Sequence, residues 1–310
     1  MEDRQIQMLM AQAEVQRALG NHRGAIELLQ RALALDPDHA RAHASLAFAL
    51  LGARRLPGAL IEMRAALHLD GNDPEVHYVA ATVLRAARKL DDAWAHCLIA
   101  LEDTSPRPAY FVLGAQIQVL RADRGRAREL LAEALALDAD HTGALTALAS
   151  LELETGALDA AALQILRALE SDPADRRAHT VAGFIDLARG NAAGAEQHAR
   201  FVLHQDGNDQ GGLELWIAIK AHRSKLLGAW WRWNTYMSMR DDTRRIAVLI
   251  GAFVIVRSLV IITDELGYPG VSRVLHFAWL GLCAYTWYAP GLFRKWLKQE
   301  LGTVRLDPDF

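Results

Sequence analysis

The chain of 310 residues is poor in cysteine, proline and aromatic side chains. We expect its two cysteines, Cys97 and Cys283, to stay unpaired, because they fall in segments of different character and reduced thiols fit a cytoplasmic environment. Nine prolines, together with 52% hydrophobic residues in which Ala and Leu dominate, favour a helical chain. The start, Met1–Gln7, is polar and no apolar core follows it, so we expect no signal peptide.

Enzyme motifs are missing as well. The sequence has no Gly-rich phosphate loop, no GxSxG nucleophile elbow and no HExxH motif. Twelve histidines include His39 and His43, four residues apart, but no third or fourth ligand is evident, so we expect no metal site. Since a function has to be argued from a site, the sequence predicts neither an enzyme nor a bound cofactor.

Small residues recur every 34 residues along the first two thirds of the chain. Such columns allow paired helices to approach closely, and a period of this size is typical of stacked supersecondary units. The columns are Ala25, Ala59, Ala93, Ala127, Ala161, Ala195; Ala32, Ala66, Ala100, Ala134, Ala168, Val202; and Ala13, Ala47, Ala81, Ala115, Ala149, Gly183.

Two breaks divide each unit into two helices. Gly20, Gly156 and Gly190 share one repeat position, where glycine tolerates the left-handed geometry that ends a helix, and Pro37 and Pro173 share the other. The pattern resembles the tetratricopeptide repeat family over residues 6–209, although the family's aromatic positions are mostly Leu, His or Phe here. The resemblance implies an all-α superhelical solenoid, residues 1–209, of about six helix-turn-helix repeats.

Composition changes after the repeats. Residues 1–209 hold 21 Lys and Arg against 29 Asp and Glu, a net charge of −8, whereas the remainder holds 13 against 8, a net charge of +5. Seven of the eight tryptophans also lie beyond residue 215. The acidic repeat region would repel phosphate, so we expect no nucleic-acid partner. The contrast indicates that the two parts meet different environments.

Two apolar stretches, Ile246–Thr263 and Val274–Phe293, predict a transmembrane helical hairpin over residues 246–293. As helices they would be about 27 and 30 Å long, close to the hydrocarbon thickness of a bilayer. Basic residues flank both outer ends, so the positive-inside rule places the repeats and both termini in the cytoplasm. The alternative for the first stretch is a buried helix of a soluble protein. The tail, residues 294–310, runs from basic to acidic.

The segments between repeats and hairpin have separate roles in this interpretation. Residues 210–225 predict a helix that caps the last repeat. Residues 226–239 predict an amphipathic helix at the membrane interface, where tryptophan is favoured; the alternative is a further cap. The residues expected at the interface are Trp230, Trp231, Trp233 and Tyr236.

Two polar residues fall within the predicted spans. Arg257 either extends toward the far interface or pairs with a group of another membrane subunit, since charges in the bilayer are costly and are usually partnered. His276 lies near the end of its span, and we expect it to face the interface.

The family resemblance implies that the first helix of each repeat lines a concave groove. Its mixture of aromatic, small polar and isolated Arg residues suits an extended peptide or a helix. The residues expected to bind a partner there are Arg41, Phe48, Glu75, Tyr78, Thr82, Arg85, Gln116, Thr146, Ser150, Arg177 and Phe184.

These features predict a membrane-anchored scaffold that holds protein partners at the cytoplasmic face of a lipid bilayer, similar in layout to membrane-anchored bacterial repeat proteins. The alternative is an accessory subunit or assembly factor of a membrane complex, bound through the hairpin and Arg257.

Overall fold

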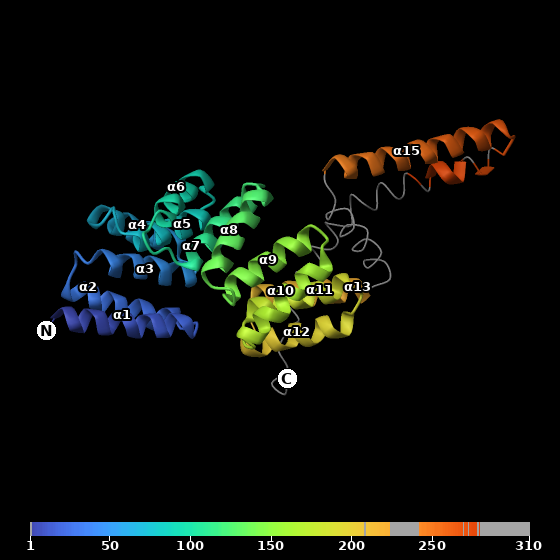
Figure 1. Ribbon diagram of the computed structural model, residues 1–310. Coiled ribbons are helices and arrows are strands. Elements are labelled where there is room, and N and C mark those ends of the chain that lie inside the picture. Colours follow the sequence, from blue (N-terminus) through green and yellow to red (C-terminus); the bar gives the residue numbers. More distant parts are fainter. Residues whose placement is uncertain are drawn as a thin grey trace. The chain divides into compact units, whose positions relative to one another are not determined.

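The computed structural model describes residues 2–207, 209–223, 242–268, 270–271, 273–277 and 279; of residues 2, 242–252 and 255 it describes the backbone alone. All regular secondary structure in these ranges is helical (Figure 1). The chain forms two compact units, Met1–Leu148 and Ala149–Phe310, and the boundary falls within one helix.

Unit 1 is built from consecutive helix pairs. Its helices are α1 (Glu2–Ala18), α2 (His22–Leu35), α3 (Ala40–Gly52), α4 (Leu56–Leu69), α5 (Pro74–Ala86), α6 (Leu90–Leu101), α7 (Pro108–Leu120), α8 (Arg124–Leu137) and the start of α9 (Thr142–Glu154). The first helix of each pair, α1, α3, α5 or α7, packs on its second helix. In addition, α1 packs on α3, α3 on α5 and α5 on α7. The first helices therefore form one layer and the second helices another, as a repeat solenoid requires.

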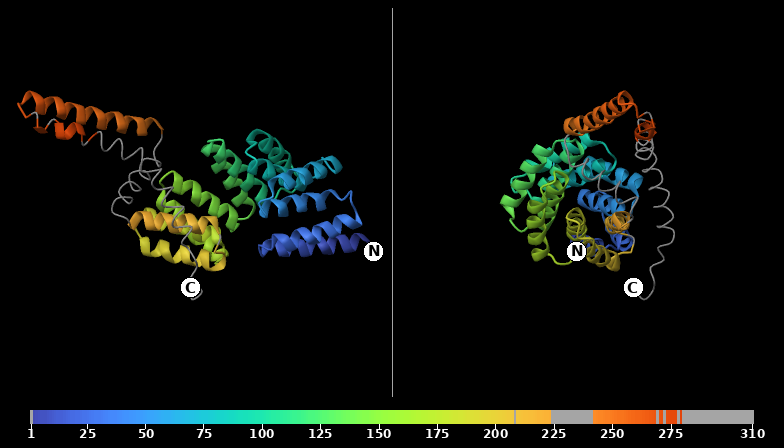
Figure 2. Two further views of the ribbon diagram at one scale, coloured as in Figure 1. Left: turned by 180° about the vertical axis from the view of Figure 1, so that it is seen from behind. Right: turned by 90° about the vertical axis from the view of Figure 1, so that its right-hand side faces the viewer.

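Unit 2 continues the alternation of first and second helices, and α13 follows its last pair. Its helices are α10 (Leu158–Ser171), α11 (Arg176–Ala188), α12 (Ala192–Gln205), α13 (Gln210–Arg223) and α15 (Asp242–Glu265) (Figure 2). At the position where a capping helix is expected, α13 packs on α11 and α12. Its Leu215 is fully buried against Leu187 and Ala195.

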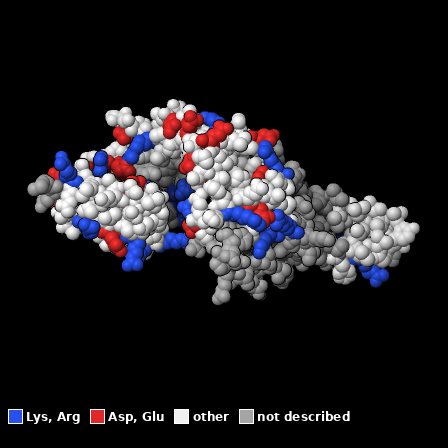
Figure 3. Space-filling model, turned by 90° about the horizontal axis from the view of Figure 1, so that it is seen from below, with Lys and Arg blue, Asp and Glu red and all other residues white. Residues whose placement is uncertain are grey.

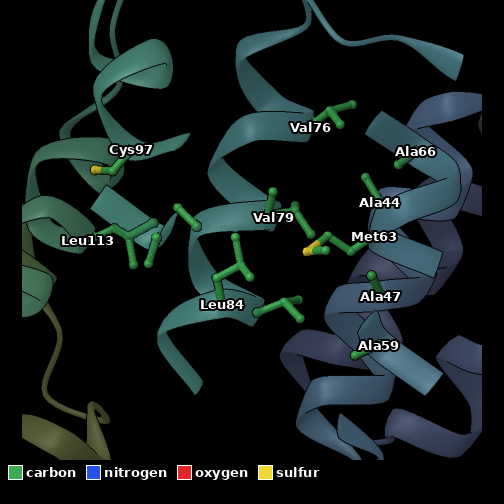
Figure 4. Packing of buried hydrophobic residues seen from close by; sticks show 14 of the residues in the cluster. Ala44, Ala47, Ala59, Met63, Ala66, Val76, Val79, Leu84, Cys97 and Leu113 are labelled. Carbon is green, nitrogen blue, oxygen red and sulfur yellow. The ribbon is translucent and has the colours of Figure 1, made fainter. Parts of the chain in front are cut away.

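The alanine columns are the contact points between helices. Every member of the column from Ala25 to Ala195 is 0% exposed. In unit 1 the largest cluster joins α3 and α4 to α5, and Met63 reaches across toward Val79 (Figure 4). A methyl group at each contact lets the helix backbones approach, while larger side chains fill the space between pairs.

The described part of the C-terminal region contains a helical hairpin. After α15 the chain turns at Leu266–Tyr268, and the following residues return so that the ring of Trp279 lies 6.4 Å from that of Phe253. Large apolar side chains of this hairpin are exposed, among them Phe253 at 52% and Phe277 at 68%. In the part of the chain for which the structure gives side chains, no helix has the length and apolar character needed to cross a membrane.

The prediction of two membrane spans is therefore not supported by the structure. The predicted interfacial helix, residues 226–239, with Trp230, Trp231, Trp233 and Tyr236, lies outside the described residues, as do most of the second apolar stretch and the tail, residues 294–310. Arg257 and His276 are described, and both are exposed.

One backbone position repeats with unusual geometry at the turn between the two helices of a pair. Gly20, Gly156 and Gly190 have φ values of 78°, 82° and 83°, which confirms the left-handed geometry expected there. Their counterparts in the other three repeats share the conformation without being glycine. These are Arg54 at 59°, Arg88 at 60° and Ala122 at 64°. Left-handed backbone costs a residue with a Cβ roughly 1–2 kcal/mol, so three turns of the solenoid are strained.

Exchanging residue types within this column should expose the strain. Gly20→Ala should lower the free energy of unfolding by about 1 kcal/mol. The strain destabilises the folded protein by more than the ~0.4–1 kcal/mol that alanine contributes by reducing the conformational entropy of the unfolded chain. Ala122→Gly should raise it by a similar amount. Urea unfolding followed by circular dichroism measures both changes.

The matched control is Gly125→Ala in α8. Gly125 has ordinary helical geometry, and an added Cβ would meet Asp123 Oδ1 at 3.6 Å, a normal contact. A Cβ at Gly20 meets no atom within 4 Å, so strain is the main change there. Gly125→Ala should stabilise the protein, and the same sign of effect at Gly20 would contradict the strain.

Candidate protein-binding face

Three aromatic side chains from successive first helices form a row in unit 1. The ring of Phe48 on α3 lies 6.3 Å from that of Tyr78 on α5, which in turn lies 5.1 Å from Tyr110 on α7. Both pairs are tilted, by 35° and 38°, within the range of favourable aromatic contacts. The rings stand at three different repeat positions, and they come into line because α3 packs on α5 and α5 packs on α7.

An arginine covers each end of this aromatic row. The guanidinium of Arg17 on α1 lies 4.6 Å from the ring centre of Phe48, and that of Arg107, just before α7, lies 4.9 Å from Tyr110. Both distances allow cation–π attraction. Arg17 also donates a hydrogen bond of 2.8 Å to Glu14, which raises the pKa of Arg17 above its usual value. The row therefore has cationic ends and an aromatic centre.

Ion pairs fix the helices beside the row. Arg107 pairs with Glu75 and donates a hydrogen bond of 2.6 Å to the Tyr110 hydroxyl, whose oxygen lies 3.3 Å from Glu75 Oε2. Arg41 Nε donates a bond of 2.5 Å to Asp73, a carboxylate only 7% exposed at the start of α5. These contacts tie α3 to α5 and α5 to α7, so the rings are held in a preformed arrangement.

The structure sorts the predicted groove residues of unit 1 by accessibility. It brings Phe48, Tyr78 and Glu75 into the row and its ion pairs, and it leaves Arg41 exposed beside them. Arg85 and Gln116 are half-buried. Two of the predicted residues lie below the surface instead. Thr82 and Thr146 are each only 6% exposed, and the Thr82 hydroxyl donates to the Tyr78 carbonyl at 2.9 Å.

The remaining predicted groove residues belong to unit 2. Ser150 on α9 is half-buried and Arg177 on α11 is exposed. Phe184 packs against the cluster that contains Leu187 and Leu215. The aromatic row is therefore a feature of unit 1.

Sequence reasoning missed Arg17, Arg107 and Tyr110. Arg17 stands 68 residues, two repeats, before Arg85, so extending the register to the first repeat would have found it. Tyr110 has no such signal, because its repeat position holds Val76 in the preceding repeat and is buried in both. Only the contacts with its neighbours show that its ring completes the row.

A second recurring feature joins the two helices of a repeat. Three histidines at one repeat position each direct Nε2 at the backbone carbonyl of the residue six positions earlier. A carbonyl only accepts, so Nε2 carries the hydrogen in all three. The contacts are His43 to Pro37 at 2.9 Å, His77 to Gly71 at 2.9 Å and His179 to Pro173 at 3.0 Å.

The Nδ1 atom of each histidine faces a residue nineteen positions later on the second helix, and the partner differs. His43 faces Glu62 Oε2 at 2.7 Å, an acceptor. In the other two repeats the partner is the Nδ1 of a second histidine, which donates to a neutral first ring. These contacts are His77 to His96 at 2.8 Å and His179 to His198 at 2.9 Å.

Within the described ranges, no three His, Cys, Asp or Glu side chains converge in a way that could hold a metal ion. Cys97 is fully buried, and burial raises the pKa of its thiol to about 12, so it is a poor nucleophile. On the face drawn in Figure 3, acidic and basic side chains occur together rather than in a field of one sign. The aromatic row is the arrangement in this part of the chain that best suits a ligand.

The fold and this row define a helical-repeat solenoid with a preformed side-chain face. Residues 16–83 and residues 115–176 each match a tetratricopeptide repeat model. The chain therefore contains tetratricopeptide repeats, as the sequence columns predict, and such repeats mediate protein–protein interaction. No curated protein matches the sequence.

Solved structures show the same fold. PilF of Pseudomonas aeruginosa is 18% identical with a TM-score of 0.51, and the match covers 69% of this chain and 98% of that one. PilW, a type IV pilus biogenesis factor, is 18% identical with a TM-score of 0.54, covering 68% and 98%. A thermophilic tetratricopeptide repeat protein of Thermus thermophilus is 24% identical with a TM-score of 0.52, covering 61% and 98%. At these identities the shared property is the solenoid fold.

The histidine pairs should make the fold sensitive to acid. Burial first, and the neighbouring imidazole second, lower the pKa of His96 and of His198, while Asp92 and Asp186 oppose the shift. The unfolded chain then binds protons more readily than the folded one. The stabilisation is complete above the ordinary histidine value of about 6.5 and is lost as the pH falls below it. We expect a lower melting temperature at pH 5.5 than at pH 7.5.

The pairing of His43 with Glu62 supplies the design of the control. His96→Glu and His198→Glu place a carboxylate opposite the first histidine in both pairs, as the second repeat already does. The double variant should lose much less melting temperature on acidification than the unchanged protein. If both proteins respond equally to pH, the histidine pairs are not the acid-sensitive element.

Proposed function

We propose that the protein is a scaffold that binds a peptide or helix of a partner protein along the aromatic row of unit 1. The observation that carries this is the line of three rings with an arginine at each end. Hot spots of protein interfaces are enriched in tryptophan, tyrosine and arginine. Phe48 and Tyr78 are only partly buried, so a partner gains contact with them.

The ion pairs around the row favour a partner that brings apolar side chains. Arg17, Arg41 and Arg107 each have a carboxylate partner within unit 1. A partner therefore does not have to neutralise these charges and instead packs against ring faces and guanidinium planes. Since the internal ion pairs hold the side chains in place, binding costs little ordering of the scaffold.

We further propose that the C-terminal region attaches this scaffold to the cytoplasmic face of a membrane. The support is the 18-residue apolar stretch Ile246–Thr263, the basic residues that flank the region, and the exposed apolar side chains of the described hairpin. Contiguous apolar surface of this kind marks contact with a membrane or another protein. The tryptophans at 230, 231 and 233 fit the headgroup region beside such an anchor.

A second candidate function is a subunit or assembly factor of a membrane complex. Arg257 favours it, because this cation is exposed in the middle of an apolar helix and has no ion pair among the described residues. A carboxylate of a neighbouring membrane subunit would pair with it.

Variants of the two candidate surfaces should separate these functions. Tyr78→Glu with Gln116→Arg keeps the net charge and disrupts the row, so the scaffold should lose its soluble partners by at least tenfold, as expected for an interface hot spot. Arg257→Leu should leave those partners bound. The measurement is quantitative mass spectrometry of proteins that co-purify from mild detergent.

Ile61→Glu is the control for the row. Ile61 is 64% exposed on α4, in the layer of second helices, so a charge there should change neither folding nor partner binding. Thermal unfolding has to show that all variants remain folded. If only Arg257→Leu loses partners, the hairpin is the binding surface and the scaffold proposal fails.

Membrane attachment predicts how the protein is extracted. The full chain should stay with the membrane through washes with high salt and with alkaline carbonate, because buried apolar surface does not respond to charge screening. Removing residues 226–310 should release a folded helical solenoid into the soluble fraction. Release of the full chain by carbonate alone would exclude a spanning anchor and leave surface association.

A further inference from the structure

The turns of unit 1 divide into two edges of opposite charge. Because first and second helices alternate in direction, every turn within a pair lies at one edge, and every turn between pairs lies at the other. The first edge has a net positive charge: it carries Arg23, Arg54, Arg55, Arg88, Lys89, Arg121 and Arg124 against Asp91, Asp92 and Asp123. The second edge has a net negative charge: it carries Asp36, Asp38, Asp70, Asp73, Glu102, Asp103, Asp138 and Asp140 against Arg41 and Arg107. We call these the basic edge and the acidic edge.

Four neighbouring cations of the basic edge have no internal role. The side chains of Arg54, Arg55, Arg88 and Lys89 are exposed and make no hydrogen bond or ion pair within the described ranges. Elsewhere on this edge the charges are paired, as Arg121 is with Asp91 at 3.1 Å. Two adjacent turns therefore hold a row of cations available to an external anion.

Backbone geometry gives an independent reason to assign these cations a role. Arg54 and Arg88 occupy the left-handed position that holds glycine in three other repeats. Each residue strains its turn, and no internal contact of its side chain offsets the strain. Strain of this kind is typical of functional positions, where an interaction outside the fold compensates for it.

A hollow of about 470 Å³ lies next to these turns. Its lining comprises Arg23, which pairs with Glu27 at 3.2 Å, together with Arg55, Gln30, Ile26 and Ala53. The basic edge therefore adjoins a concave surface in which, among the described residues, Arg55 is exposed and has no internal partner while Arg23 is paired with Glu27.

We propose that the basic edge of unit 1 lies against anionic lipid headgroups and so orients the repeats on the membrane; this rests on the proposed membrane attachment. A plane of fixed anions strengthens adsorption about fivefold for each nearby Lys or Arg. Binding to an acidic protein surface would gain less affinity per cation, because each exposed ion pair has to order two side chains and is screened by water. Single-stranded nucleic acid needs stacking aromatics, and the turns at 52–56 and 86–90 contain none.

The test measures which edge approaches the lipid. A dye is attached to the full chain carrying Cys283→Ser and either Ala86→Cys at the basic edge or Asn72→Cys at the acidic edge; both positions are exposed. Cys97 is buried and should not be labelled. Two kinds of vesicle are used, each with a quencher on some headgroups. Neutral vesicles contain phosphatidylcholine alone, and anionic vesicles contain phosphatidylcholine with roughly one third phosphatidylglycerol. In anionic vesicles the Ala86 dye should be quenched more than the Asn72 dye, and salt should remove the difference.

The matched variants are Arg54→Gln with Arg88→Gln, against Arg31→Gln with Arg64→Gln on exposed positions of the second helices. Glutamine keeps the strained backbone and removes only the charge. The first pair should weaken edge contact roughly 25-fold, at about fivefold per cation, and the second pair should leave it unchanged. Equal quenching at both edges, or a difference that survives the first pair, overturns the proposal.

Vesicle flotation in the same experiment separates this proposal from membrane anchoring. Flotation with neutral vesicles and equal quenching at both edges would support the anchor and refute the basic edge. Flotation with anionic vesicles alone, with the Ala86 dye preferentially quenched, would support the edge and refute the anchor. A change in dye emission on adding single-stranded RNA, lost in the Arg54 and Arg88 variant, would assign the edge to nucleic acid instead.

Discussion

The close approach of paired helices at alanine is the contact on which the rest of the structure depends. Ala25, Ala59, Ala93 and Ala127 are each 0% exposed, so the same small side chain stands at the helix contact in every pair of unit 1. Equal side chains at equivalent contacts favour equal helix separations. Equal separations stack successive repeats in one register, so that equivalent positions of different repeats lie in line. The two charged edges follow directly from that alignment, whereas the rings of the aromatic row stand at three different repeat positions on neighbouring first helices. Neither requires residues that are adjacent in sequence.

The repeat architecture could be predicted because the small residues recur with a fixed period of 34 residues. Each alanine column samples the same local contact six times, and a solenoid has few long-range contacts that override local pattern. The details that escaped prediction lie where one repeat differs from the others. Tyr110 stands at a position that Val76 occupies one repeat earlier. Its place in the aromatic row is shown only by its contacts with Tyr78 and Arg107. Nor does periodicity show that Thr82 turns its hydroxyl to the backbone rather than to a partner.

The histidines show the same limit in another way. Their common position marks them as structural, and the hydrogen bond to a preceding carbonyl bears that out for all three. Their partners nineteen residues later are a carboxylate in one repeat and an imidazole in two. One fold position thus makes different hydrogen bonds in different repeats. The family pattern fixes the place of the ring, and the individual sequence fixes its chemistry.

The left-handed turns at Arg54, Arg88 and Ala122 have a consequence for the motions of unit 1. In a linear array, the cost of opening one segment depends on that repeat and its neighbours alone, so local defects are not averaged over a common core. The three strained turns are consecutive, while the turn at Gly20 is relaxed. The free energy of local opening would then be lower around the three strained turns than around Gly20, so amide hydrogens near the strained turns would exchange faster with solvent. The repeats that carry the aromatic row thus combine rings held in place by ion pairs with turns that open more readily than the turn of the first repeat.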